Sequence, residues 1–342
     1  MIGRMVCGFL VLLWLSPTAA KPAKDVVVVR TASVAPEGTP WEKQLKRAKK
    51  YFTKDSNKRI KVKTFLGGAK GDEKSIVRQC RDGRLELIGV STAALATVVP
   101  ELQVLELPFL FDSTEQAYYV LDKHLYKPVK ALLAKYGFVM YQWAENGWQN
   151  MGMKNGFVKS PEDLVGRRMR SQEATVHLDT WKTFGASPTE MPVSEVLQAL
   201  QTGRVDGFSQ TPLMTFAATW YKGIEYYTIT HHVYQPAILV YSKKWFDKQE
   251  AGIQKTLLGR IKKGTKYGRR GVRKLEPALL ENFEYAGIKL YELSDAERAK
   301  FREVGLKVHD LYKQKATDDG RRLLALIEAG KADFKKRKGS GK

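Results

Sequence analysis

The sequence predicts an α/β protein of two lobes that follow one another along the chain, with a helical C-terminal segment packed across both. Two observations lead to this prediction. Apolar, β-branched runs of strand length alternate with amphipathic helical patterns, and this alternation restarts near residue 166. The length of 342 residues also fits about two domains.

The first lobe opens with the β-branched strand Val26–Ser33. Four further strands are expected at Ile60–Phe65, Leu85–Val90, Val104–Phe111 and Phe138–Trp143. One buried helix face is marked by Trp41, Leu45, Ala48 and Phe52. Asp72 is expected to cap the next helix, and Ser113–Gln116 to open a later helix as a capping box.

The second lobe repeats the alternation, with a strand at Arg167–Arg170 and a helix near residues 174–184. Residues 187–208 are typical of a β-α-β unit. In this unit, Ser194 is expected to cap the helix and Gly203 to end it in a left-handed conformation.

Val233–Tyr241 is one more apolar strand, and beyond Lys243 the chain is almost wholly helical. Several glycines and Pro277 interrupt residues 247–287. This stretch is therefore either one long kinked helix or two helices in line. Ser294–Glu297 is a second capping box.

The composition excludes several classes of protein. With 58 Lys+Arg against 36 Asp+Glu the formal charge is +22, but 43% hydrophobic residues are enough for sizeable cores and argue against disorder. Two cysteines cannot build a disulfide scaffold or a Cys-rich zinc module.

The N-terminus is typical of a secretory leader. Residues 1–20 contain the cation Arg4, the apolar run Val6–Leu15, and small residues before a predicted cleavage after Ala20. The alternative is an uncleaved anchor. Cleavage leaves Cys80 as the only cysteine, so the exported chain would have no internal disulfide.

Catalytic and cofactor motifs are not found. Gly67–Gly71 lacks the Lys-Ser/Thr ending of a phosphate loop. His231 and His232 point to opposite faces of a strand and cannot chelate a metal together. No nucleophile elbow is present and no carboxylate pair is indicated. The sequence therefore predicts no enzyme, no cofactor and no metal.

Two arginines, Arg168 and Arg170, share one face of their predicted strand. An arginine at the carboxyl end of a strand, facing a cleft between lobes, can hold a carboxylate with two parallel hydrogen bonds. A solvated surface arginine is an equal alternative from spacing alone.

The basic charge includes the run Lys335–Lys338 and lysines on every predicted helix. Nucleic acid is excluded as a partner because the chain is exported and the charge is dispersed. An exported polyanion- or surface-binding protein that uses its basic face remains the alternative function.

Three blocks together carry a family resemblance: Gly166–Arg170, Phe184–Met191 and Ser194–Gly207. Their order and spacing resemble the periplasmic solute-binding proteins of TRAP transporters (DctP-like). Ala35–Trp41 and Leu107–Phe109 agree with this resemblance. It implies a clamshell with crossing strands and a long C-terminal hinge helix, which closes on a small organic carboxylate and docks on TRAP membrane permease subunits.

The resemblance also implies a division of the chain. Lobe I would comprise residues 25–146 and 236–275, and lobe II residues 147–235 and 276–334. Residues 335–342 would be a basic tail.

In this family an arginine grips the ligand carboxylate, and the matching residue here is Arg170. Gln149 stands where a second arginine is common, and Ser209-Gln210 where the family usually has Glu-Asn. Ser91 and Val193 match an acidic and an aromatic contact of a sialic-acid-binding member. The implied ligand-binding set is Arg170, Gln149, Gln210, Trp148, Phe208, Val193 and Ser91.

Several charged or polar residues that are usual in the family are absent at these positions. Their absence favours a ligand that has a carboxylate and an apolar body, with the body packed against a wall of Trp148, Phe208 and Val193. Ordinary core packing is the equal alternative for these three. The same features resemble the subclass partnered by a tetratricopeptide-repeat lipoprotein.

Overall fold

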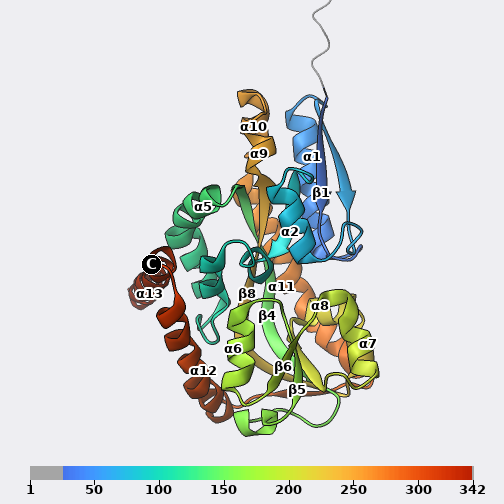
Figure 1. The fold of residues 1–342 in the computed structure, drawn as a ribbon, viewed down its shortest axis with the longest axis vertical. Helices are drawn as coiled ribbons and strands as arrows, with labels where there is room; N and C mark the ends of the chain where they lie inside the picture. Colours follow the sequence, from blue (N-terminus) through green and yellow to red (C-terminus); the bar gives the residue numbers. More distant parts are fainter. Residues whose placement is uncertain (1–25, 341–342) are drawn as a thin grey trace, which may run out of the picture.

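The computed structural model describes residues 26–340 and shows one nine-stranded sheet shared by two lobes (Figure 1). The strand order is β2-β1-β3-β8-β4-β7-β5-β6, and β9 pairs with β8. The middle strands β4 (Phe138–Met153) and β8 (Tyr226–Ser242) are antiparallel and run through both lobes. The two-lobe clamshell with crossing strands is thus confirmed. The predicted leader, residues 1–20, lies outside the described residues.

Lobe I is built around the parallel strands β1 (Val27–Ala32), β2 (Ile60–Phe65) and β3 (Leu87–Ser91). Its helices are α1 (Pro40–Asp55), α2 (Glu73–Arg81), α3 (Thr92–Leu95), α4 (Thr114–Tyr119), the π-helix η2 (Val120–Leu125) and α5 (Tyr126–Lys135). Asp72 and Ser113 cap their helices as predicted, each accepting a hydrogen bond from a backbone N–H three residues on. Cys80 is fully buried in the core.

The predicted strand Val104–Phe111 is wrong. Residues Pro100–Glu106 form the 3-10 helix η1. The apolar residues of this segment are buried on every side, so their pattern has no period that separates helix from strand. Pro100 and Pro108 also lack the backbone N–H groups that donate the hydrogen bonds between neighbouring strands of a sheet.

Lobe II holds the parallel strands β5 (Arg168–Ser171), β6 (Ser187–Glu190) and β7 (Gly207–Gln210). Its helices are η3 (Pro161–Leu164), α6 (Thr175–Thr183), η4 (Val193–Glu195), α7 (Val196–Gln201), α8 (Pro212–Ala217) and η5 (Trp220–Gly223). Gly203 is left-handed as predicted, with φ +72°. Ser194 is not the predicted N-cap, because it lies inside the short helix η4.

Residues 247–287 of the C-terminal segment form two helices and not one kinked helix, since Arg260 adopts a left-handed φ of +58° between them. Its elements are α9 (Lys243–Phe246), α10 (Ala251–Leu257), α11 (Ile261–Tyr285), β9 (Lys289–Glu292), α12 (Asp295–Lys315) and α13 (Asp318–Gly339). The long α11 contacts α1 in lobe I and α8 in lobe II.

The last helix departs from the predicted division of the chain. The family resemblance places residues 276–334 in lobe II, but α13 packs against α4, η1 and η2 of lobe I. The reason is the length of α12, which spans about 30 Å and returns the chain to lobe I (Figure 1). No helix within residues 26–340 is long and apolar enough to cross a membrane.

Candidate functional site

A cavity of about 560 Å³ lies between the two lobes. Lobe I contributes residues of α1, α2 and β3, and lobe II contributes residues of β5, η4 and β7. The crossing strands supply the floor through Asn146 and Gln235. Because residues of both lobes line one space, a bound molecule would contact both lobes at once.

Arg170 is the one arginine among the residues that line this cavity. Alternation along β5 buries Met169 in the lobe II core and turns Arg170 to the opposite face. The side chain is only 3% exposed, and its Nε and Nη2 donate to the carbonyl oxygen of Met191 at 3.2 and 3.0 Å. Its guanidinium lies 5.1 Å from the ring centre of Trp220. These contacts hold the group in one orientation.

The Nη1 atom of Arg170 is buried and has no hydrogen-bond partner among the described residues. Burial lowers the pKa of Arg170 to about 10, although Glu73 and Glu173 oppose this shift. The side chain therefore stays charged at neutral pH. A buried cation with an unused hydrogen-bond donor is unfavourable unless an acceptor forms a hydrogen bond with that donor.

Two amides bring further donors to the same region. Gln172, two residues after Arg170 and 9% exposed, accepts a hydrogen bond on Oε1 from Gln235, while its Nε2 has no partner among residues 26–340. The Oε1 of Gln210 accepts from the backbone N–H of Thr211 at 2.8 Å, which leaves its NH₂ group as the available donor. Gln172 was not predicted, although it lies only two residues after Arg170, just beyond the end of β5.

Carboxylates from another part of the wall supply acceptors. Glu73, at the start of α2, accepts hydrogen bonds from the backbone N–H and the Oγ of Ser91, both at 2.8 Å. Burial raises the pKa of Glu73, and the hydrogen bonds from Ser91 oppose this rise. Glu173 lies nearby with its carboxylate 3.8 Å from Lys74 Nζ. The cavity therefore has both donor and acceptor groups in its wall.

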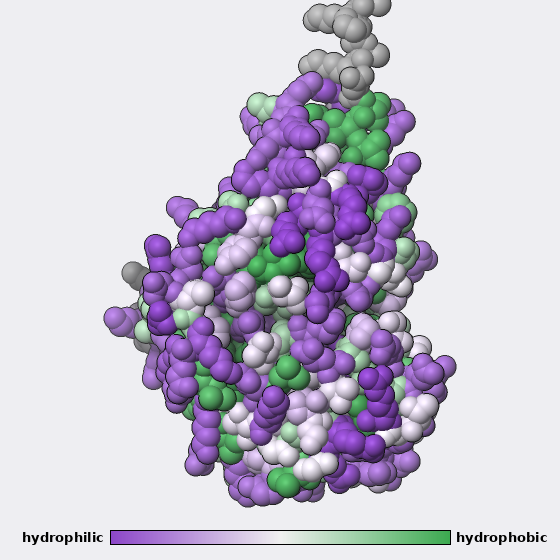
Figure 2. All heavy atoms as spheres, in the orientation of Figure 1, coloured by the Kyte–Doolittle hydropathy of each residue, from purple (hydrophilic) through white to green (hydrophobic). Residues whose placement is uncertain are grey.

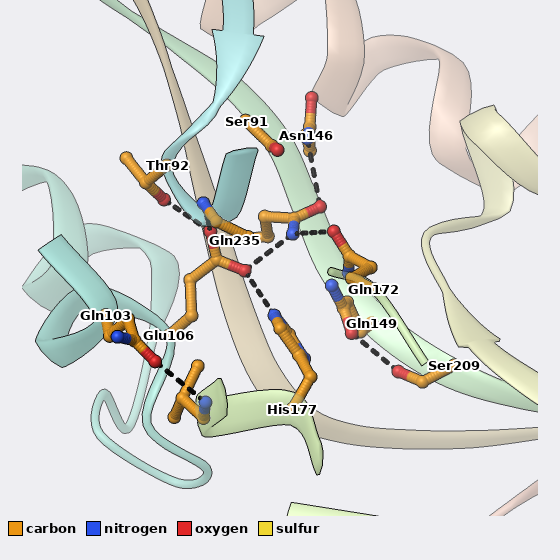
Figure 3. A network of polar contacts seen from close by, with 12 residues as sticks. Ser91, Thr92, Gln103, Glu106, Asn146, Gln149, Gln172, His177, Ser209 and Gln235 are labelled. Atoms are coloured by element: carbon orange, nitrogen blue, oxygen red, sulfur yellow. Dashed lines mark hydrogen bonds and ion pairs between the residues drawn. The ribbon is translucent and has the colours of Figure 1, made fainter. Parts of the chain in front are cut away.

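A buried network below the cavity fixes the amides of its floor (Figure 3). Glu106 is fully buried and accepts hydrogen bonds from Gln235 Nε2 at 2.6 Å and Thr92 Oγ1 at 2.5 Å. His177 Nε2 of lobe II lies 2.7 Å from the same carboxylate. Gln235 Oε1 accepts from Asn146 Nδ2 at 2.9 Å. The network therefore joins lobe I, lobe II and both crossing strands.

The structure places four of the seven predicted ligand-binding residues in the cavity wall: Arg170, Gln210, Val193 and Ser91. Ser91 donates to Glu73, so the acidic group expected at its position comes from the neighbouring helix instead.

The other three predicted residues, Trp148, Phe208 and Gln149, do not line the cavity. Trp148 packs on Tyr234 in the core of lobe I, and Phe208 packs on Trp220 in lobe II. The core-packing alternative therefore describes both aromatic residues.

Gln149 is also fully buried, and its Oε1 accepts from Ser209 Oγ. Trp148 and Gln149 are adjacent on β4 and therefore take opposite faces of the sheet, with Trp148 in the core of lobe I and Gln149 against Ser209.

No group of three or more His, Cys, Asp or Glu side chains within residues 26–340 is arranged to hold a metal ion. Of the two adjacent histidines, His232 is buried and His231 is half-buried, and burial lowers the pKa of His231 to about 4 and that of His232 to about 3. His232 lies between Ser209 Oγ and Thr230 Oγ1, at 3.0 and 2.6 Å. It is a neutral member of the core.

Comparison with known proteins identifies relatives along most of the chain. The model of bacterial extracellular solute-binding protein, family 7 (DctP) matches residues 31–315. A solute-binding protein of Verminephrobacter eiseniae is 33% identical over 267 residues, which cover 78% of each chain. The 2,3-diketo-L-gulonate-binding periplasmic protein of Escherichia coli is 26% identical and covers 79% of this chain and 81% of its own.

Solved structures show the same architecture with a ligand. The sugar acid binding protein DctPAm of Advenella mimigardefordensis, in complex with galactonate, is 27% identical with a TM-score of 0.84. The alignment covers 90% of this chain and 99% of that one.

Proposed function

We propose a ligand chemistry for this chain, which belongs to the DctP family of bacterial extracellular solute-binding proteins. Proteins of this family are extracytoplasmic and serve transport, and this chain is a TRAP-type solute-binding protein. The proposal is that it binds a small hydroxylated carboxylate in the cavity between its lobes.

The observation that carries this proposal is the buried, unpaired Nη1 of Arg170. A carboxylate accepts hydrogen bonds only, and the donors of Arg170, Gln172 and Gln210 line the same cavity. A carboxylate bound there would neutralise the buried guanidinium and fill its vacant donor. The sequence predicted the arginine but not the neighbouring Gln172.

Two carboxylates in the wall support a hydroxylated body for the ligand. Trp148 and Phe208, which favoured an apolar body, lie outside the cavity, whereas Glu73 and Glu173 line it. Carboxylates accept hydrogen bonds from hydroxyl groups, and their burial is costly without such donors. The expectation of a tetratricopeptide-repeat partner was based on the same apolar wall and therefore loses that support.

Calorimetric titration tests the ligand class. We expect at least one of galactonate, D-glucuronate, D-galacturonate and D-erythronate to bind, and D-glucose, which lacks the carboxylate, not to bind. Octanoate supplies a carboxylate with an apolar body. Tighter binding of octanoate than of every sugar acid would contradict the hydroxylated body and restore the apolar one.

Closure of the two lobes is expected to accompany binding. Arg170 belongs to lobe II and Glu73 to lobe I, so one ligand can engage both only when the lobes are together. Small-angle scattering should show a smaller radius of gyration with the best-binding sugar acid and no change with D-glucose. An unchanged radius at saturation would argue against a clamshell mechanism.

Delivery to TRAP membrane permease subunits completes the proposed function, because a binding protein of this family acts before a transporter. It requires export, for which the leader at residues 1–20 provides the signal. N-terminal sequencing of the exported protein should begin at Lys21. A chain that still begins at Met1 would point to a membrane-tethered protein instead.

A further inference from the structure

The solvent faces of α1 and the first half of α11 join into one surface. The two helices approach closely: a Cβ added to Gly268 of α11 would lie 2.1 Å from Gln44 Oε1 of α1. Across the seam between them, the Arg47 guanidinium lies 4.2 Å from the ring centre of Tyr267. The charged side chains of the two helices therefore belong to one continuous surface and attract or repel the same solutes.

This surface, which we call the basic face, carries an excess of exposed cations. They are Lys43, Lys46, Arg47, Lys49, Lys50 and Lys54 on α1, and Lys262, Lys263, Lys266, Arg270 and Lys274 on α11. Within residues 40–55 the only carboxylates are Glu42 and Asp55, which pair with Lys46 and Arg260. Residues 261–274 contain no carboxylate at all. Hydrophilic side chains also cover most of the face of the molecule seen in Figure 2.

The spacing of these cations is unfavourable for the isolated protein. Lys262, Lys266, Arg270 and Lys274 follow one another at intervals of four residues. Like charges at this spacing repel and destabilise a helix. A groove beside α1 is lined by Thr53, Asn57 and five lysines: Lys46, Lys49, Lys50, Lys54 and Lys58. An external array of anions would relieve the repulsion.

We infer that the basic face docks on the anionic phospholipid headgroups of a membrane surface. The cores of protein interfaces are depleted in lysine and enriched in aromatic residues, whereas this groove has five lysines and no apolar side chain. Lysines are flexible point charges, which suit headgroups that rearrange freely. Clusters of such residues bind anionic bilayers with an affinity that increases with every cation.

The basic face does not obstruct the cavity between the lobes. On α1 the side chains of Trp41, Gln44 and Leu45 line that cavity, while the lysines take the exposed side of the helix. The protein can therefore lie on a membrane with its cavity accessible. The inference depends on charge and position and not on the identity of the ligand.

Vesicle sedimentation with the mature chain tests this inference. We expect binding to vesicles of phosphatidylcholine with phosphatidylglycerol, little binding to phosphatidylcholine alone, and release by added salt. The variant with Lys50→Gln, Lys54→Gln, Lys266→Gln and Arg270→Gln should bind roughly 600-fold more weakly, since each of the four cations contributes about fivefold. Arg170→Ala should bind the vesicles like wild type, which separates this test from the ligand proposal.

The matched control removes the same charge elsewhere, through Lys307→Gln, Arg322→Gln, Lys335→Gln and Lys336→Gln on α12 and α13. It should retain nearly all vesicle binding. Equal loss in both variants would overturn the inference in favour of net charge alone. Polyglutamate serves as a model of an acidic protein. If wild type binds neither the anionic vesicles nor polyglutamate, the basic face has no anionic partner and the inference is overturned. If wild type binds polyglutamate but not the vesicles, the inference is overturned in favour of an acidic protein as partner.

Discussion

Replacing Arg170 by alanine is expected to weaken binding of the best sugar acid by about 2–5 kcal/mol, or about 30-fold to several thousand-fold in Kd. The guanidinium is buried and held by the Met191 carbonyl, so its orientation is fixed before a carboxylate binds. Its removal would leave the ligand carboxylate buried without its countercharge. Calorimetry on the variant and wild type measures the difference directly.

Arg168→Ala is the matched control, because Arg168 lies on the same strand and has the same side chain. It is exposed and pairs with Asp206 at the surface, and we expect it to leave ligand affinity nearly unchanged. Arg170→Lys should recover only part of the affinity, since an ammonium cannot donate to the Met191 carbonyl and a carboxylate with the same planar geometry. Wild-type affinity in both Arg170 variants would show that the carboxylate binds elsewhere.

The sequence predicted most local elements that a period or a cap marked, with the cap expected at Ser194 as an exception. The caps Asp72 and Ser113 and the left-handed Gly203 depend on interactions within a few residues, and each lies where it was expected. The predicted strands Phe138–Trp143 and Val233–Tyr241 were too short. Both are buried on two faces at the centre of the sheet, where alternation no longer marks their ends.

The site was predicted less completely than the fold, because it depends on contacts between distant segments. Arg170 could be found from its motif, and its burial followed only from the packing of lobe II. Glu73 reads as an ordinary first-turn carboxylate of a helix, and only the pairing with Ser91, 18 residues later, brings it to the cavity. Trp148 and Gln149 lie on a strand that is buried on both faces, so the sequence does not show that neither side chain reaches the cavity.

The buried carboxylate of Glu106 was hidden within the run Leu105–Leu107 and is the second group with a large expected effect. One oxygen accepts from Thr92 Oγ1 and the backbone N–H of Ala93, and the other from Gln235, with His177 Nε2 at 2.7 Å. An ionised carboxylate suits this position because both oxygens accept.

Glu106→Gln should therefore destabilise the folded protein by about 3 kcal/mol. The NH₂ group of the new glutamine would face hydrogen-bond donors in either orientation of its amide, because both oxygens of Glu106 accept hydrogen bonds. The loss is measured as a lower free energy of unfolding in urea. Glu303→Gln, an exposed residue of α12, is the control and should stay within about 0.5 kcal/mol of wild type.

The ligand affinity of Glu106→Gln should fall as well, because Gln235 would no longer be held toward Gln172 and Asn146, and the polar groups of the cavity floor would lose their fixed orientation. An unchanged free energy of unfolding together with an unchanged ligand affinity would show that the hydrogen bonds of Glu106 neither stabilise the contact between the lobes nor orient the polar groups of the cavity. The donors around Arg170 would then bind the ligand without help from this network.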